Sequence, residues 1–149
     1  MAPTNILRQG NTRKTAPRRA AAVPRREILI RAGRIAIRAR LLDTVTAERI
    51  WATLPIYSTV ETWGAAVHFE THAETGREAD AKWSVAPGEI AFWVEQDRVV
   101  IGFGSTPISR PGEIRLPSPC NIWALALDDV TALAVARPGE RVAVLVADS

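Results

Sequence analysis

The hydrophobic pattern that decides the fold class is most regular in residues 27–40, Glu27-Ile-Leu-Ile-Arg-Ala-Gly-Arg-Ile-Ala-Ile-Arg-Ala-Arg40. Isoleucines recur at every second position on both sides of Ala32-Gly33, and after the glycine they alternate with Arg34, Ala36, Arg38 and Arg40. Because successive side chains of a strand point to opposite faces, this alternation predicts two strands joined by a turn. We therefore expect a β-hairpin with one charged face.

In residues 43–54 the apolar residues no longer alternate but follow the spacing of a helix. This predicts a short amphipathic helix that ends before Pro55. Thr44 or Asp43 can accept hydrogen bonds from the N–H groups of the first turn. Trp51 on the apolar stripe is expected to fill a core site. The stripe has the spacing i, i+3, i+4 and i+7, and consists of Ala47, Ile50, Trp51 and Leu54.

The rest of the chain shows short strand-like segments bounded by glycine or proline. About eight short strands and two short helices in residues 27–149 predict an all-β fold. A small closed barrel is favoured, because closure removes unpaired strand edges. The further strand-like segments are 57–62, 65–71, 89–93, 98–103, 121–127 and 141–146, with a short extended piece at 113–116 and the second helix at 129–135.

Composition indicates one soluble globular domain. The chain has 149 residues, of which 47% are hydrophobic, and this length can bury a core without disulfides or metals. A single cysteine, Cys120, excludes an intramolecular disulfide and multi-cysteine zinc sites, and it favours a reducing compartment. No run approaches the ~18 apolar residues of a transmembrane helix. We expect a cytoplasmic protein without a membrane partner.

The charges divide the chain into two segments. Residues 1–26 contain seven basic residues, no acidic residue and three prolines, which leaves 12 basic and 16 acidic residues in 27–149. The first segment has too little apolar surface to offset its ordering entropy, so we expect a disordered basic tail, 1–26, before a folded domain, 27–149. The tail is a solvated extension, an over-called translation start in an arginine-rich genome, or a weak contact for nucleic acid or an acidic surface.

Several motifs resemble the small bacterial and archaeal cyclophilin-like domain proteins over nearly all of 27–149. The resemblance implies an eight-stranded cyclophilin-like barrel with a groove on its outer side. It is carried by Asp43-Thr44 before Trp51-Ala52-Thr53-Leu54-Pro55, Trp63-Gly64 with Phe69, Pro87-Gly88-Glu89-Ile90-Ala91-Phe92-Trp93, Phe103-Gly104-Ser105-Thr106-Pro107-Ile108-Ser109, Glu113-Ile114-Arg115, Pro117-Ser118-Pro119 and Asn121.

The same resemblance leaves activity open between two classes. True cyclophilins isomerise prolyl bonds with an arginine beside a hydrophobic pocket and carry Phe-His-Arg and Gln-Gly-Gly segments. The nearest counterpart here is Ala66-Val67-His68-Phe69, without the arginine. A neutral histidine cannot replace a permanent cationic donor. A divergent peptidyl-prolyl cis-trans isomerase would need a substitute such as Arg98 or Arg115.

The preferred hypothesis is a module that binds a peptide or small molecule in the outer groove. His68 would form its floor, because Val67 and Phe69 alternate with it and face the other way. The loop that holds Thr106, Pro107 and Ser109 would form one wall. Trp63 in a turn and Trp93 at a strand end would offer aromatic faces, whereas Trp51, Trp83 and Trp123 are expected in or near the core.

Other chemistry has weaker support in the sequence. His68, Glu70 and His72 share one side of a strand, but the two histidines lie ~13 Å apart along it, too far to share one ion through bonds of ~2 Å. Cys120 has no adjacent histidine or helix N-terminus and is expected to be buried. We therefore expect no metal and no cofactor.

Overall fold

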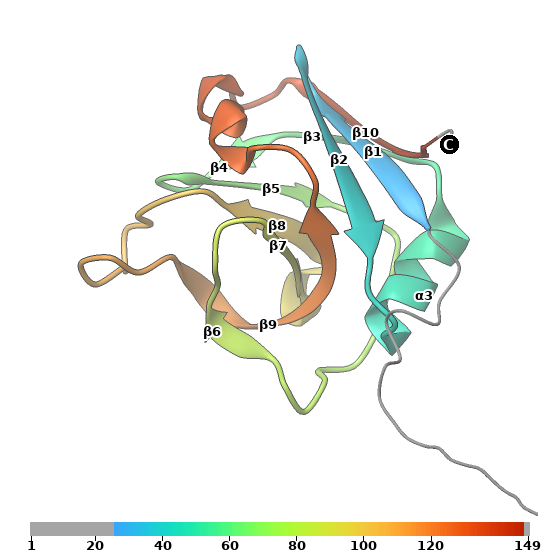
Figure 1. Ribbon diagram of the computed structural model, residues 1–149, viewed down its shortest axis with the longest axis horizontal. Coiled ribbons are helices and arrows are strands. Elements are labelled where there is room, and N and C mark those ends of the chain that lie inside the picture. The colour runs from blue at the N-terminus through green and yellow to red at the C-terminus, as the bar shows by residue number, and fades with distance from the viewer. Residues whose placement is uncertain (1–25, 148–149) are drawn as a thin grey trace, which may run out of the picture.

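The computed structural model describes residues 26–147, which form one strongly curved sheet with a few short helices (Figure 1). Nine strands follow the order β3-β10-β1-β2-β9-β7-β8-β5-β4, and β6 pairs with β9 beside this path. The strands are β1 (Glu27–Ala32), β2 (Ile35–Leu41), β3 (Ile56–Thr59), β4 (Glu61–Thr62), β5 (Ala66–Glu70), β6 (Lys82–Ser84), β7 (Glu89–Trp93), β8 (Arg98–Gly102), β9 (Arg115–Ala126) and β10 (Arg141–Val146).

Every strand pair in the sheet is antiparallel, and the two end regions of the path, β3 and β5–β4, lie close in the sequence. Because the end strands β3 and β4 follow each other directly in the chain, the two edges of the sheet lie near each other. The sheet is therefore curled into a nearly closed barrel (Figure 1). The all-β barrel expected from the sequence is confirmed. The number of strands differs from the expected eight, because the segment expected at 57–62 is divided into β3 and β4 and because β6 was not expected.

The hairpin predicted from residues 27–40 is confirmed as β1 and β2, with Ile30 opposite Ile37. Gly33 occupies the turn with a φ of 59°, a left-handed conformation that glycine adopts without steric cost. The isoleucines at 28, 30 and 37 are buried, whereas Arg38 is exposed. Alternation along each strand thus separates an interior face from a charged exterior face.

The predicted first helix is α3 (Val45–Thr53), and Thr44 is its N-cap, accepting from the Ala47 backbone N–H at 3.0 Å. Ala47 and Ile50 are buried, as the stripe predicts. Trp51 packs against the core but remains half-buried, and the guanidinium of Arg26 lies 5.0 Å from the centre of its ring. Trp51 therefore covers the margin of the core instead of filling its centre.

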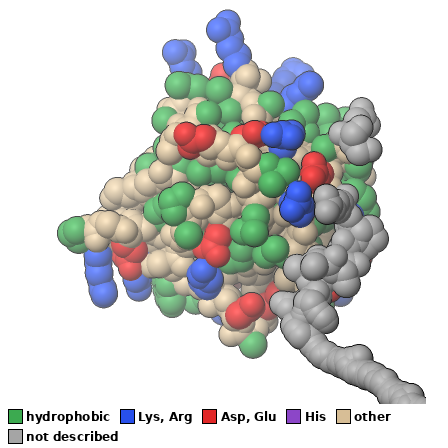
Figure 2. All heavy atoms as spheres, viewed as in Figure 1, with side chains coloured by type: hydrophobic (Ala, Val, Ile, Leu, Met, Phe, Trp, Pro, Cys, Tyr) green, Lys and Arg blue, Asp and Glu red, His purple; other side chains and the backbone are tan. Residues whose placement is uncertain are grey.

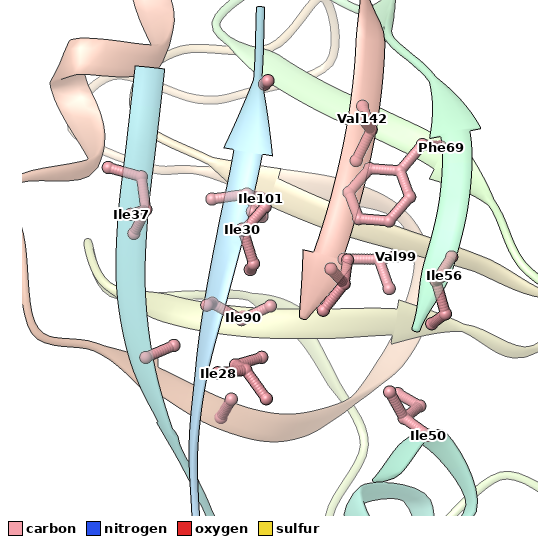
Figure 3. Close-up of a cluster of buried hydrophobic side chains, with 14 of the residues drawn as sticks. Ile28, Ile30, Ile37, Ile50, Ile56, Phe69, Ile90, Val99, Ile101 and Val142 are labelled. Atoms are coloured by element: carbon pink, nitrogen blue, oxygen red, sulfur yellow. The ribbon is translucent and has the colours of Figure 1, made fainter. Parts of the chain in front are cut away.

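One large apolar cluster fills the interior of the barrel (Figure 3). Its side chains come from strands on all sides of the barrel and from α3, so it joins segments that are distant in the sequence. Burial of this apolar surface is the main force that closes the sheet. The labelled members are Ile28, Ile30, Ile37, Ile50, Ile56, Phe69, Ile90, Val99, Ile101 and Val142.

A second, smaller cluster covers the outer side of β7 and β8. Ala91 and Val100 face outward between interior residues of the same strands, and they pack with Val85, Ile114, Leu116 and Cys120. Trp93 lies against the margin of this cluster. The barrel wall is consequently apolar on both faces here, which explains why β7 and β8 are buried along most of their length.

Two expectations for this region are wrong. Residues 113–116 and 121–127 do not form separate pieces, because β9 runs from Arg115 to Ala126 through Pro117 and Pro119. The register of β6 against β9 shifts between Lys82 and Ser84, and an irregular ladder tolerates prolines that lack an N–H donor. Trp83 is 45% exposed, not near the core.

Two 3₁₀ helices complete the described chain, η2 (Val94–Gln96) and η3 (Val130–Val135). The second is the predicted second helix, with Asp129 accepting from the Thr131 N–H at 2.9 Å. The expected basic tail, and its contact with nucleic acid or an acidic surface, lies outside the described residues except for Arg26. Within 26–147 the chain contains no helix with the length and apolar character needed to span a membrane.

Candidate functional site

A small apolar pocket lies on the outer face of the barrel where β5, β7, β8 and β9 meet. Its volume is about 180 Å³. The structure brings together three of the residues that the sequence suggested, Trp63, His68 and Trp93, and adds Val100 and Pro117. His68 and Val100 are directly opposite in the β5–β8 ladder. Antiparallel pairing therefore places the imidazole of His68 beside the apolar side chain of Val100.

His68 is the polar group of this pocket. Arg98 Nη1 lies 3.0 Å from Glu61 Oε2 and 3.4 Å from His68 Nδ1. Since a guanidinium has only donors, Nδ1 must be the acceptor in the second contact. The neutral ring then carries its proton on Nε2. His68 thus adds one imidazole N–H to a mostly apolar lining, whose two indoles each carry an N–H of their own.

The charge state of His68 agrees with this assignment. Burial lowers the pKa of His68 below its ordinary value, and the adjacent positive charge of Arg98 lowers that pKa further, against a smaller opposite effect of Glu61. The rings of His68 and Trp93 meet edge to face, with centroids 6.0 Å apart and planes at 75°. His68 is therefore held neutral and oriented by Arg98 and Trp93.

Trp63 is positioned by a tight turn between β4 and β5. Its backbone N–H donates to the Ala66 carbonyl at 2.9 Å, and Gly64 has a φ of 58°. A β-carbon at Gly64 would lie 2.8 Å from Pro107 Cδ. Glycine is needed for both reasons, the left-handed backbone and the close approach of the 104–109 loop.

The remaining three candidates, Thr106, Pro107 and Ser109, do not line this pocket. Thr106 is buried, and its hydroxyl donates to the Arg115 carbonyl at 2.6 Å. The Ser109 hydroxyl oxygen accepts from the backbone N–H groups of Thr106 and Arg115 at 2.9 and 3.0 Å. Pro107 is exposed. These residues join the loop to β9 and support the Trp63 turn from behind.

Val100 and Pro117 were not among the residues that sequence reasoning selected. Val100 lies in the middle of a strand that looks uniformly apolar, so its sequence does not show that its side chain faces outward. Pro117 was noted only as part of Pro117-Ser118-Pro119. No local signal places either residue beside Trp63, because the barrel brings them together from different strands.

Arg98 and Arg115, the candidate substitutes for a catalytic cation, and Arg38 on the charged exterior face differ in position. Arg98 touches His68 at the pocket, as described above. Arg115 lies over the ring of Trp83 at 5.0 Å and pairs with Glu113, and Arg38 pairs with Asp128. Arg98 is consequently the one of these three that contacts a lining residue.

Nucleophilic and metal chemistry find little support in the described residues. Burial raises the pKa of the Cys120 thiol to about 12, so the reactive thiolate is scarce at neutral pH. The expected burial of Cys120 is confirmed. Across residues 26–147, no three His, Cys, Asp or Glu side chains are grouped so that they could hold a metal ion.

Comparisons with known proteins agree with the fold. The model of the Cyclophilin-like family matches residues 26–145. The solution structure of the hypothetical protein AF2241 from Archaeoglobus fulgidus is similar, with 28% identity and a TM-score of 0.72 over 83% of this chain and 95% of that chain. No curated protein matches the sequence. With its barrel topology, outer pocket and a family match over most of its length, the chain belongs to the cyclophilin-like family.

Proposed function

We propose that the pocket between Trp63, His68 and Trp93 is a recognition site for a peptide or small molecule that inserts one apolar group. The observation that carries this proposal is a mostly apolar lining beside an imidazole whose Nδ1 contact with Arg98 leaves its proton on Nε2. An apolar group would be desolvated between the two indoles. A neighbouring carbonyl would accept from His68 Nε2–H.

The size of the pocket limits what it binds. Its volume of about 180 Å³ is below the roughly 300–1,000 Å³ of pockets that enclose whole drug-sized ligands. One ring or one branched side chain is therefore a suitable occupant. The remainder of the ligand would lie over the outer face of the barrel, where backbone contacts contribute little sequence selectivity.

Divergent prolyl isomerase activity is the second candidate function, and the position of Arg98 is what favours it. Isomerisation would require the guanidinium to donate to the prolyl nitrogen while the amide twists. Arg98 Nη1 already contacts both Glu61 and His68, and its side chain is only 19% exposed. The guanidinium is therefore already engaged by Glu61 and His68 and little exposed, which favours binding without catalysis.

Binding can be tested with four tetrapeptides, Ala-Ala-Xaa-Ala, in which Xaa is Pro, Leu, Phe or Gly. Amide and indole signals of the full chain would be followed by NMR during titration. We expect at least one apolar peptide to shift the signals of Trp63, His68 and Trp93 at millimolar concentration, and the glycine peptide to have no effect. If none of the three apolar peptides binds, the proposal is wrong.

Trp93→Ala removes one wall of the pocket and should weaken that binding about tenfold, which corresponds to ~1.4 kcal/mol. Trp83→Ala is the matched control, because Trp83 is exposed outside the pocket, and it should leave the affinity unchanged. Equal loss in both variants would show that the peptides do not enter the pocket.

Catalysis can be separated from binding by a protease-free measurement of cis-trans exchange in the proline tetrapeptide. We expect the exchange rate to stay near its uncatalysed value at high protein concentration. Acceleration that Arg98→Ala abolishes, in a variant that still unfolds cooperatively, would replace the binding function by isomerase activity.

A further inference from the structure

A second groove lies on the barrel exterior, formed by other strands than those of the tryptophan pocket. It is an open depression of about 760 Å³ across the outer side of β1, β10 and β3, and it extends to the end of β5. It shares no lining residue with the first pocket. Its lining includes Arg31, Tyr57, Glu70, Arg141 and Ala143.

The strand register explains how this groove is built. Arg31 is opposite Ala143, and Ala143 is opposite Tyr57, so the three residues form one row across the exterior face. Arg141 precedes Ala143 by two positions on the same strand and therefore points to the same face. Ala143 lies in the middle of this row, and because its side chain is small, it leaves a hollow between Arg31 and the exposed Tyr57.

The register also brings two cations together. Arg31 and Arg141 are diagonal neighbours on paired strands, with α-carbons ~7–8 Å apart. Long guanidinium side chains from such positions can converge on one anion with parallel N–H donors. Both arginines are exposed. Figure 2 shows basic side chains projecting at the end of the molecule where β1 turns into β2.

Arg31 and Arg141 belong to the half of the described arginines that have no carboxylate partner. Arg26, Arg38, Arg40, Arg77, Arg98 and Arg115 each pair with a carboxylate. Among residues 26–147, neither Arg31 nor Arg141 has a salt bridge or a side-chain hydrogen bond. Glu70 is the single acidic residue of the lining. The lining therefore carries two cations against one carboxylate, and the carboxylate of Glu140 lies beside Gly33 at its edge.

We propose that this groove binds a small organic anion that carries a carboxylate or phosphate on a planar ring. The anionic group accepts hydrogen bonds from Arg31 and Arg141. The ring lies over Ala143 against Tyr57, whose side chain is 70% exposed and open to stacking. The volume is in the range of small-molecule sites, roughly 300–1,000 Å³.

Phenyl phosphate and benzoate serve as probes for the two anionic groups, and phenol serves as the neutral comparison. The full chain is titrated with each compound, and backbone amide shifts are followed by NMR. We expect one or both anions to shift the amides of Tyr57, Arg141 and Ala143, with affinity that falls as salt is raised. Phenol should shift none of them. Which anion binds more tightly distinguishes a phosphate ligand from a carboxylate ligand.

Variants decide whether the two arginines form the site. Arg31→Gln and Arg141→Gln should each weaken binding about tenfold, as expected for loss of a charge-assisted hydrogen bond. Arg49→Gln is the matched control, because Arg49 is exposed on α3, lies outside the groove and has no ion pair within 26–147. It removes the same charge and should leave binding unchanged.

Several results would overturn the proposal. One is the absence of any shift with both anions up to about 10 mM, the weak end of specific recognition. Another is equal weakening by Arg49→Gln, which would indicate a diffuse charge effect. Shifts confined to residues 1–25, which carry six basic side chains, would place the binding outside the groove. Trp93→Ala serves as a further check, since it should leave anion binding intact even if the tryptophan pocket fails to bind peptides.

Discussion

Trp51 and Trp123 both pack against the interior cluster, but only Trp123 is completely enclosed. Trp123→Ala should lower the free energy of unfolding by ~3–5 kcal/mol, because a large buried side chain leaves a cavity. Trp51→Ala should cost about 2 kcal/mol, since part of its ring already faces solvent and Arg26. Urea unfolding of both variants tests this order. A larger loss for Trp51→Ala would contradict the burial observed here.

His68 should make stability depend on pH. Its pKa is lowered in the folded protein by burial and then by Arg98, so the folded state binds a proton less readily than the unfolded state. The stability from neutral His68 is complete above its unfolded pKa of ~6.5 and is lost as pH falls through the lower folded pKa.

The comparison variant for this effect is His68→Asn, which cannot titrate near neutral pH. Urea unfolding of both proteins at several values below pH 7 should show the advantage of the wild type over His68→Asn decreasing as the solution becomes more acidic. A constant or growing advantage would show that the pKa of His68 is not lowered. An NMR titration of the His68 ring gives the same direction independently.

At the scale of elements, the hydroxyl groups of Thr106 and Ser109 both join the 104–109 loop to Arg115 of β9. Ser109→Ala removes the acceptor for the N–H groups of Thr106 and Arg115, and each donor left unsatisfied destabilises the fold. We expect a loss of about 1–3 kcal/mol in the free energy of unfolding. Ile108→Ala, at an exposed neighbouring position, should cost less than about 1 kcal/mol.

The 104–109 loop either supports the Trp63 turn or contacts the bound peptide, and Ser109→Ala separates these two roles. Thr106, Pro107 and Ser109 lie behind the Trp63 turn and outside the pocket lining. If Ser109→Ala left the affinity for apolar tetrapeptides nearly unchanged while lowering stability, the loop would act as a support. A strong loss of peptide affinity at unchanged stability would make Ser109 a contact residue.

For the whole molecule, the folded unit should start at Arg26 instead of Glu27. The Arg26 carbonyl accepts from the Leu41 N–H at 2.9 Å, its guanidinium pairs with Glu48 at 2.7 Å, and it covers Trp51. A chain starting at Arg26 should unfold cooperatively with the stability of the full chain. A chain starting at Glu27 loses these contacts and should be less stable by about 1 kcal/mol.

Thermal and urea unfolding of the two shortened chains and the full chain measure this difference. The separation of a basic tail from a folded domain, which rests on the charge pattern of the sequence, is tested in the same experiment. If both shortened chains lost cooperative unfolding, residues before 26 would contribute to the core.

The sequence by itself determined the local elements and the fold class. Alternation in 27–40 specifies which side chains share a face, because the two-residue period of a strand is a local property. The spacing from Ala47 to Leu54 likewise specifies α3, and Thr44 and Pro55 mark its ends. The motifs of the family then indicated the barrel into which these elements assemble, and the family match agrees.

Only the tertiary structure decided which residues meet. Alternation assigns His68 to the exterior, but the register of β5 against β8 is what places Val100 beside it. Trp83 and Trp123 look alike in sequence, yet one is exposed and the other enclosed. Likewise Arg31 and Arg141 are 110 positions apart in the chain and become neighbours through the β1–β10 ladder. Periodicity is set within a strand, whereas pockets and charge clusters depend on pairing between distant strands, which interior packing selects.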